Sequence, residues 1–232
     1  KKRRVVFTHT AIFIFIFPFI AGDKEKFYII LKKIFNKSSG IVIAVLLFLL
    51  TVSIQGIIYF IQSGFFFNDS YVVEQFIWNR PEIINVLFSY KKGLFIYTPV
   101  ALTALTGLIP LYRRSSFSFW YFILFFLLIT YVFSCWWNWW YGGSFGARPY
   151  VEYFSLFGLL LAFTLSKTKK KPGKIIVYFI LTFFIILCQF QTYQYRYFII
   201  HWEKMDKEHY WRVFMRIDQL IKQENANADL LK

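Results

Sequence analysis

One stretch of the chain combines residue types that could bind an anionic, partly apolar ligand. This tryptophan motif, residues 136–149, reads WWNWWYGGSFGARP, and its aromatic residues favour the boundary between a membrane and water. Gly142 and Gly143 permit unusual backbone conformations, and Arg148 supplies a planar charge suited to phosphate. The motif predicts a site for an anionic head group at a membrane surface. The alternative is an aromatic belt followed by a tight turn.

Other charged residues near this motif allow two interpretations each. Lys91 and Lys92 precede an apolar run, so they could hold a phosphate or simply meet lipid head groups. Arg148 and Glu152 are four residues apart, so on an α-helix they would share a face and could pair with each other. The pattern therefore nominates Arg148, Lys91 and Lys92 as anion ligands, with ion pairing as the rival for Arg148.

No motif for a familiar catalytic mechanism stands out. The sequence has no nucleophile elbow, phosphate loop, metalloprotease helix or Asp-x-Asp. If the chain transfers a sugar, its general base is a residue outside the chain or one of the following carboxylates: Glu152, Asp69, Glu74 or Glu82.

Metal and disulfide chemistry are not indicated. His201 and His209 begin a polar tail without the spacing of a metal site, and we expect them to be surface residues. Cys135 and Cys188 lie in or beside apolar runs and form no disulfide framework. No cofactor is evident, and a divalent metal stays an open question.

The composition predicts an all-α membrane protein. Of 232 residues, 58% are hydrophobic and 24% are aromatic, in repeated runs near the spanning length of about 20 residues. We expect a polytopic helical bundle over residues 1–200, a short surface helix that starts near Pro81, and a soluble helical tail over residues 201–232. The bundle has about six predicted spans: 5–21, 41–61, 93–111, 117–135, 151–165 and 175–190.

The distribution of positive charge predicts the orientation in the membrane. The net charge of +15 does not indicate nucleic acid, because the lysines cluster in short loops between apolar runs. Loops after the first, third and fifth spans hold 12 cations, which are Lys24, Lys26, Lys32, Lys33, Lys37, Arg113, Arg114, Lys167, Lys169, Lys170, Lys171 and Lys174. Loops after the second and fourth hold 4, namely Arg80, Lys91, Lys92 and Arg148. The first set should be cytoplasmic, which places the tryptophan motif and the tail outside the cytoplasm; the basic residues 1–4 disagree with this assignment.

The start of the chain also carries an expectation. The first residue is Lys1, and the apolar run after residues 1–4 lacks a signal-peptide cleavage site. We expect a fragment whose N-terminal half is missing or is supplied by a partner subunit, and we expect no sugar transfer by this chain alone.

Three segments in order resemble a known group of proteins. These are residues 89–99 (SYKKGLFIYTP), 139–148 (WWYGGSFGAR), and 200–202 (IHW) with 207–211 (KEHYW). Together they resemble the C-terminal half of bacterial GT-C-like membrane glycosyltransferases that use polyprenyl-phosphate sugars. The resemblance covers about residues 22–231.

The resemblance implies an activity and a place in the cell. It implies a multi-pass protein of the bacterial inner membrane that takes a sugar from a polyprenyl-phosphate donor on the extracytoplasmic face. The donor phosphate would contact Arg148 and Lys91 or Lys92, while the aromatic residues of the motif would stack on sugar or prenyl. The implied site residues are Arg148, Lys91, Lys92, Trp139, Trp140, Tyr141, Gly142 and Gly143, with Glu152 as a candidate acid. The family's usual base lies in a first extracytoplasmic loop, which would precede Lys1.

Two other classes of function stay in view. A transporter or flippase for lipid-linked glycans should place ionisable residues in the middle of the membrane, whereas here they gather at the ends of the spans. A non-catalytic membrane scaffold needs no glycine-rich loop that ends in an arginine. Both comparisons favour an enzyme at the membrane surface.

Overall fold

The computed structural model describes residues 21–36, 38–65, 74–168 and 170–216. Over these ranges the chain is helical, and the only extended pairing is a single antiparallel bridge between Phe76 and Trp136. This confirms the all-α prediction for the described part. The elements are α2 (Lys24–Asn36), α3 (Ser38–Ser63), α4 (Ile83–Phe88), α5 (Leu94–Tyr97), α6 (Pro99–Ala104), η1 (Leu105–Gly107), α7 (Leu108–Arg114), α8 (Ser116–Ser134), η2 (Arg148–Tyr153), α9 (Phe154–Lys167), α10 (Lys171–Arg196) and α11 (Lys207–Val213).

Four of these helices are long and apolar enough to cross a membrane. They are α3, α8, η2 with α9, and α10, and they contain the runs predicted at 41–61, 117–135, 151–165 and 175–190. Length and composition thus indicate a multi-pass membrane protein. The predicted run 5–21 lies outside the described residues except for Ala21.

The run predicted at 93–111 is divided into short pieces. Thr98 adopts a non-helical conformation (φ −137°, ψ 64°) between α5 and α6 because Pro99 follows it, and proline disfavours helical geometry at the residue before it. The chain then passes through the 3₁₀-helix η1 into α7, which contains Pro110. The result is a kinked path of four helical pieces rather than one continuous helix.

Gly107 allows η1 to approach α9 closely. A Cβ atom at Gly107 would collide with the backbone carbonyl of Leu160 in α9, so the two backbones meet only because this residue has no side chain. A hydrogen bond between Thr106 Oγ1 and Thr164 Oγ1 (3.0 Å) joins the same two elements. A second polar link joins η2 to the C-terminal part of α8: the Tyr150 hydroxyl donates to Thr130 Oγ1 (2.8 Å). These polar links supplement an apolar core in which Phe122, Phe157 and Leu160 are buried.

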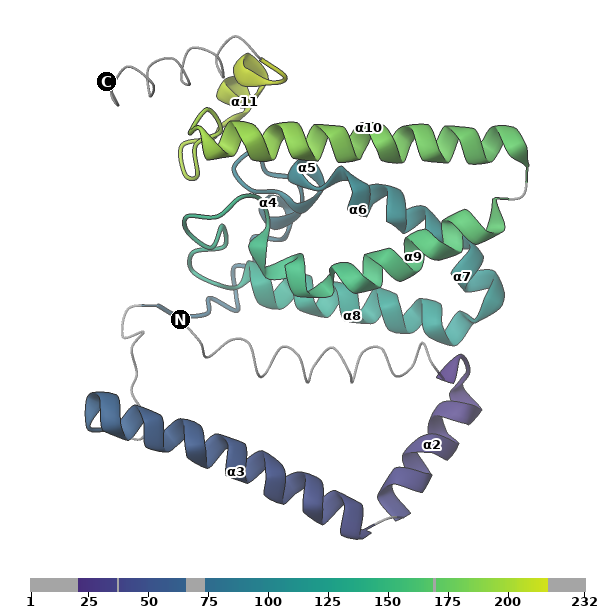
Figure 1. The fold of residues 1–232 in the computed structure, drawn as a ribbon, viewed down its shortest axis with the longest axis vertical. Helices are drawn as coiled ribbons and strands as arrows, with labels where there is room; N and C mark the ends of the chain where they lie inside the picture. The colour runs from purple at the N-terminus through teal and green to yellow at the C-terminus, as the bar shows by residue number, and fades with distance from the viewer. Residues whose placement is uncertain (1–20, 37, 66–73, 169, 217–232) are drawn as a thin grey trace, which may run out of the picture.

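The helices α2 and α3 lie to one side of the bundle that α4 to α10 form (Figure 1). In the most apolar window of α3, 0% of the residues are buried inside the structure. Its side chains are apolar on every face, as expected of a helix surrounded by lipid.

The bundle has two ends with different charge. The ends of α7 and α9 and the starts of α8 and α10 lie together in Figure 1, and α2 begins beside them. We call this the basic end; its described cations are Lys24, Lys26, Lys32, Lys33, Arg113, Arg114, Lys167, Lys170, Lys171 and Lys174. We call the opposite end the motif end; it comprises residues 74–93, 135–153 and 197–216.

Candidate functional site

The tryptophan motif is the loop that joins α8 to η2 at the motif end, and the segment before α4 holds its first residues in place. The Trp137 amide donates to the carbonyl of Gln75 (3.1 Å), and the Ile77 amide donates to the carbonyl of Cys135 (2.6 Å). The Glu82 amide donates to the carbonyl of Ser134 (3.0 Å). The motif therefore begins from a fixed backbone and not from a free loop.

The middle of the motif turns sharply through left-handed backbone conformations. Tyr141 (φ 55°), Gly142 (φ 66°) and Gly146 (φ 56°) all have positive φ, which is uncommon for a tyrosine. At Gly146 a Cβ atom would lie 3.1 Å from Cβ of Tyr97, so glycine also permits close packing there. Gly143 has no such requirement, since a Cβ there would meet open space.

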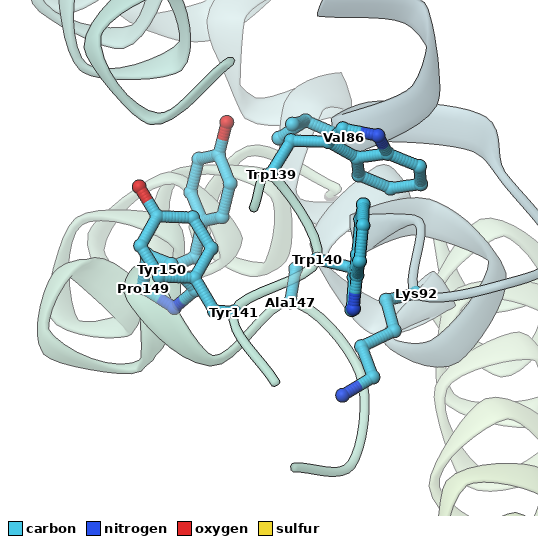
Figure 2. A pocket seen from close by; sticks show the side chains of 8 residues that line it. All are labelled: Val86, Lys92, Trp139, Trp140, Tyr141, Ala147, Pro149 and Tyr150. Carbon is cyan, nitrogen blue, oxygen red and sulfur yellow. The ribbon is translucent and has the colours of Figure 1, made fainter. Parts of the chain in front are cut away.

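Lys92 connects the loop before α5 to the motif. Its side chain is only 3% exposed, and its ammonium group donates to the carbonyl of Gly142 and to Ser144 Oγ (3.3 Å). Figure 2 shows this side chain pointing along Trp140 into the bend of the motif. The structure thus brings Lys92, a predicted anion ligand, into contact with the tryptophan motif. Lys92 and Gly142 are fifty residues apart in the chain.

The other two predicted anion ligands lie within electrostatic reach of Lys92. The Lys91 ammonium group sits 3.5 Å from the ring centroid of Trp140, a cation–π contact. Arg148 is exposed at the start of η2. Burial lowers the pKa of Lys92 to about 8; the charges of Lys91 and Arg148 also lower it, and Glu203 opposes the shift. Burial likewise lowers the pKa of Lys91, again opposed by Glu203.

Arg148 and Glu152 do not form the ion pair that their spacing allows on an α-helix. Among the residues that the structure describes, the one ion pair joins Lys26 to Asp23 (3.5 Å). The reason is that residues 148–153 form the 3₁₀-helix η2, which has three residues per turn, so residues four apart point in different directions. Arg148 is exposed, Glu152 is partly buried, and the pairing interpretation has no support in this geometry.

The aromatic residues of the motif fill the space around Lys92. Trp139 and Trp140 are in edge contact (5.6 Å between centroids), and the Tyr141 hydroxyl donates to the carbonyl of Phe133 (3.2 Å). Between the rings is a cavity of about 10 Å³, room for about one water molecule. Its lining residues are Val86, Lys92, Trp139, Trp140, Tyr141, Ala147, Pro149 and Tyr150 (Figure 2). A sugar or a phosphate therefore needs these rings to move.

The first part of the C-terminal tail packs onto Tyr90 and onto the end of α10, which the sequence reasoning missed. The Tyr210 ring packs in a tilted contact with that of Tyr90 (5.1 Å between centroids), and the Trp211 ring N–H donates to the Tyr90 hydroxyl (3.3 Å). Buried Gln191 donates to the Tyr210 hydroxyl (2.7 Å). This packing brings Glu203 near the two lysines. The spacing of the buried Tyr210 and Val213 on α11 was the available signal.

The remaining candidates are scattered. The Glu82 carboxylate accepts a hydrogen bond from the side-chain amide of Asn85 (2.7 Å) at the start of α4. Glu74 precedes the bridge between Phe76 and Trp136 that anchors the motif. Asp69 lies outside the described residues. His201 accepts the amides of Glu203 and Lys204 and so caps a turn. Within the described part, no cluster of three or more metal-ligating side chains occurs.

Comparison with protein-family models, with curated proteins and with solved structures found no match for this chain.

Proposed function

We propose that this chain is all or part of a membrane glycosyltransferase of the GT-C type, which takes a sugar from a polyprenyl-phosphate donor. The observation that carries the proposal is Lys92, a buried cation held against the tryptophan motif. Within the described part it has no carboxylate at ion-pair distance. A buried, unpaired charge is costly, and near a membrane such a group is a functional candidate by default.

The charge balance around Lys92 favours an anionic ligand. The charges of Lys91 and Arg148 both act on Lys92, and Glu203 is the carboxylate that acts on both lysines. Three cations facing one carboxylate leave an excess of positive charge. A lipid phosphate would satisfy this excess with charge-assisted hydrogen bonds.

The proposed reaction is an inverting displacement at the anomeric carbon of the donor sugar. The acceptor oxygen forms the new bond to that carbon while the bond to the prenyl-phosphate oxygen breaks, so the leaving group departs with the electron pair. Lys91, Lys92 and Arg148 stabilise the phosphate as its charge increases. Glu152 lies in η2, three residues after the end of the motif, and we propose it for testing as the base that takes the acceptor proton.

The small cavity sets a condition on this mechanism. The cavity has room for about one water molecule, which is too small for a sugar or a phosphate, so the described arrangement corresponds to a site closed to its ligand. We propose that the donor phosphate replaces the contacts of Lys92 with Gly142 and Ser144, which frees the loop to turn and moves Trp139 and Trp140 onto the sugar or prenyl chain.

We further propose the topology. The kinked path from α5 to α7 would be a fifth crossing, in addition to the four long helices. The basic end would face the cytoplasm of a bacterium and the motif end would face outward, because cations accumulate in cytoplasmic loops.

A flippase for lipid-linked glycans is the second candidate, since it would recognise the same phosphate. The position of the three cations at one end of the bundle favours the enzyme, because a transporter needs its binding site near the membrane midplane. A scaffold gives no reason for a buried, unpaired lysine.

The test is binding of undecaprenyl phosphate to the full chain in nanodiscs. We expect Lys92→Gln to weaken binding about ten- to a hundred-fold, the value of one lost charge-assisted contact. Lys174→Gln, which removes a lysine at the basic end, should leave binding unchanged, and undecaprenol without phosphate should bind neither protein. Unchanged affinity in a folded Lys92→Gln variant would sink the proposal. Movement of undecaprenyl phosphate between the leaflets of vesicles that contain the full chain would instead favour the flippase, because absence of sugar transfer by this chain alone is expected under both proposals.

A further inference from the structure

The helix α2 at the basic end has two chemically different faces. At 100° per residue, Phe27, Leu31 and Ile34 fall on one side, while Lys26 and Lys33 fall on the other. Asp23 fixes the start of the helix by accepting the amide of Lys26 (2.8 Å). A helix with this pattern suits the plane between lipid and water.

Two contacts hold the start of α2 at the level where the spanning helices end. The Ser115 hydroxyl, between α7 and α8, donates to the carbonyl of Gly22 (2.5 Å). The ring of Phe27 packs near that of Phe117 in the first turn of α8 (5.6 Å between centroids). Since α8 has the length and composition of a span, its first turn marks a membrane boundary.

The apolar side of α2 is largely uncovered by the described part of the chain. Tyr28 is 65% exposed and Phe35 is 67% exposed, and Ile34 is also exposed. The lysines of α2 are exposed as well. An apolar face at a membrane boundary, flanked by cations, therefore has no cover among the described residues.

The charge around α2 identifies the chemistry of its partner. Among the residues that the structure describes, the basic end carries ten cations and two carboxylates, Asp23 and Glu25. Arg114, the last residue of α7, packs over the ring of Phe163 (5.4 Å) and so links the cations of α7 to those at the end of α9. Anionic phospholipid head groups complement this charge, and their acyl chains complement the apolar face.

We propose that α2 lies flat in the interface of the leaflet at the basic end and binds an anionic phospholipid surface. Its apolar face enters the acyl layer, and its lysines contact the lipid phosphates. This role is separate from the proposed glycosyl transfer, because it uses residues at the opposite end of the bundle.

The first experiment measures the depth of the two faces. The full chain, with Cys135→Ala and Cys188→Ala, receives a single cysteine at Phe35 or at Lys33, each carrying an environment-sensitive fluorophore. In vesicles of phosphatidylcholine with phosphatidylglycerol, we expect nitroxide on the acyl chains to quench the probe at 35. A water-soluble quencher should reach the probe at 33. Equal access of the water-soluble quencher to both probes would overturn the proposal. Protection of both probes from the lipid quencher and from the water-soluble quencher would also overturn it, and would indicate that a second copy or another segment covers α2.

The second experiment tests the charge. A variant with Lys24, Lys26, Lys32 and Lys33 all changed to Gln should lose local enrichment of nitroxide-labelled phosphatidylglycerol around the probe at 35, by up to about five-fold for each lysine. The matched control changes Lys204 and Lys207 to Gln at the motif end and should retain the enrichment. Equal enrichment in both variants would rule out recognition by these lysines.

Discussion

The two ends of the bundle are both positively charged, yet they use their cations differently. At the basic end, ten lysines and arginines face two carboxylates, and the lysines of α2 are exposed. At the motif end, eight cations mix with six carboxylates, but one lysine, Lys92, is buried against a glycine-rich turn. Exposed charge is screened by water and salt, whereas buried charge must find a specific partner. Burial, more than the number of charges, therefore distinguishes the proposed phosphate site from the proposed lipid-binding surface.

The largest expected difference between the two ends is their side of the membrane. Single cysteines at Gly143 (motif end) and Ser166 (basic end), in a background without Cys135 and Cys188, can be labelled in intact cells with an impermeant maleimide. We expect labelling at 143 and none at 166, because the cations of the basic end should be cytoplasmic. The reverse result would invert the proposed topology and remove the site from the outer face.

Removal of Arg148 should have the next largest effect. A guanidinium–phosphate contact contributes roughly 1.5–3 kcal/mol, so we expect Arg148→Ala to weaken binding of undecaprenyl phosphate about ten- to a hundred-fold. Arg148→Lys should recover only part of this loss, because it keeps the charge without the planar fork. Thermal stability provides the control: it should change little, since Arg148 is exposed and lacks an ion pair with Glu152. Loss of stability without loss of binding would contradict the assignment.

The pKa of Lys92 predicts a pH dependence confined to the motif end. Lys92 loses its proton as pH rises through about 8, so the affinity for lipid phosphate should fall about five-fold between pH 8 and pH 9, in proportion to the protonated fraction. The folded-state pKa lies below the usual value of 10.5, so the unfolded chain binds more protons between these values and stability should rise with pH there. Binding thus weakens while the fold becomes more stable. Lys92→Arg should abolish the fall in affinity, and a fall that persists would assign it to another group.

The smallest expected effect concerns the contact of Lys91 with Trp140. A partly exposed cation–π contact contributes about 0.5–1 kcal/mol, so Trp140→Leu should weaken phosphate binding only about two- to five-fold by releasing Lys91. Trp120→Leu, at an exposed position on α8 away from the motif, is the matched control. A loss as large as that of Arg148→Ala would mean that Trp140 itself contacts the lipid.

The long helices were predictable from the sequence because hydrophobic length is a local property. A run of about 20 predominantly apolar residues is enough to predict a span, and such runs occur in α3, α8, η2 with α9, and α10. The path from α5 to α7 was less predictable: Pro99 and Pro110 were visible, but the position of the kinks depends on Thr98 and on the close approach of Gly107 to Leu160.

The site was predictable in its residue types but not in its contacts. Residue types alone nominated the motif, Lys91 and Lys92 as candidates. The hydrogen bond from Lys92 to the Gly142 carbonyl joins positions fifty residues apart, and hydrophobic periodicity does not predict contacts over that separation. The pairing of Arg148 with Glu152 assumed 3.6 residues per turn, and the local 3₁₀ geometry of η2 removed it. The position of Glu203 near the two lysines could not be predicted either, because it depends on the packing of α11 on Tyr90.

The isolation of α3 has a consequence for how its sequence can change over time. Because none of its apolar window is buried against the described chain, selection acts there mainly on the average affinity for lipid and on length. The order of its leucines, isoleucines and valines should drift freely among descendants, and a scrambled version of the helix should insert as well as the original. Gly107, by contrast, lies against backbone and should tolerate no larger residue. One chain would thus contain one of its fastest-changing segments and one of its slowest within the same membrane.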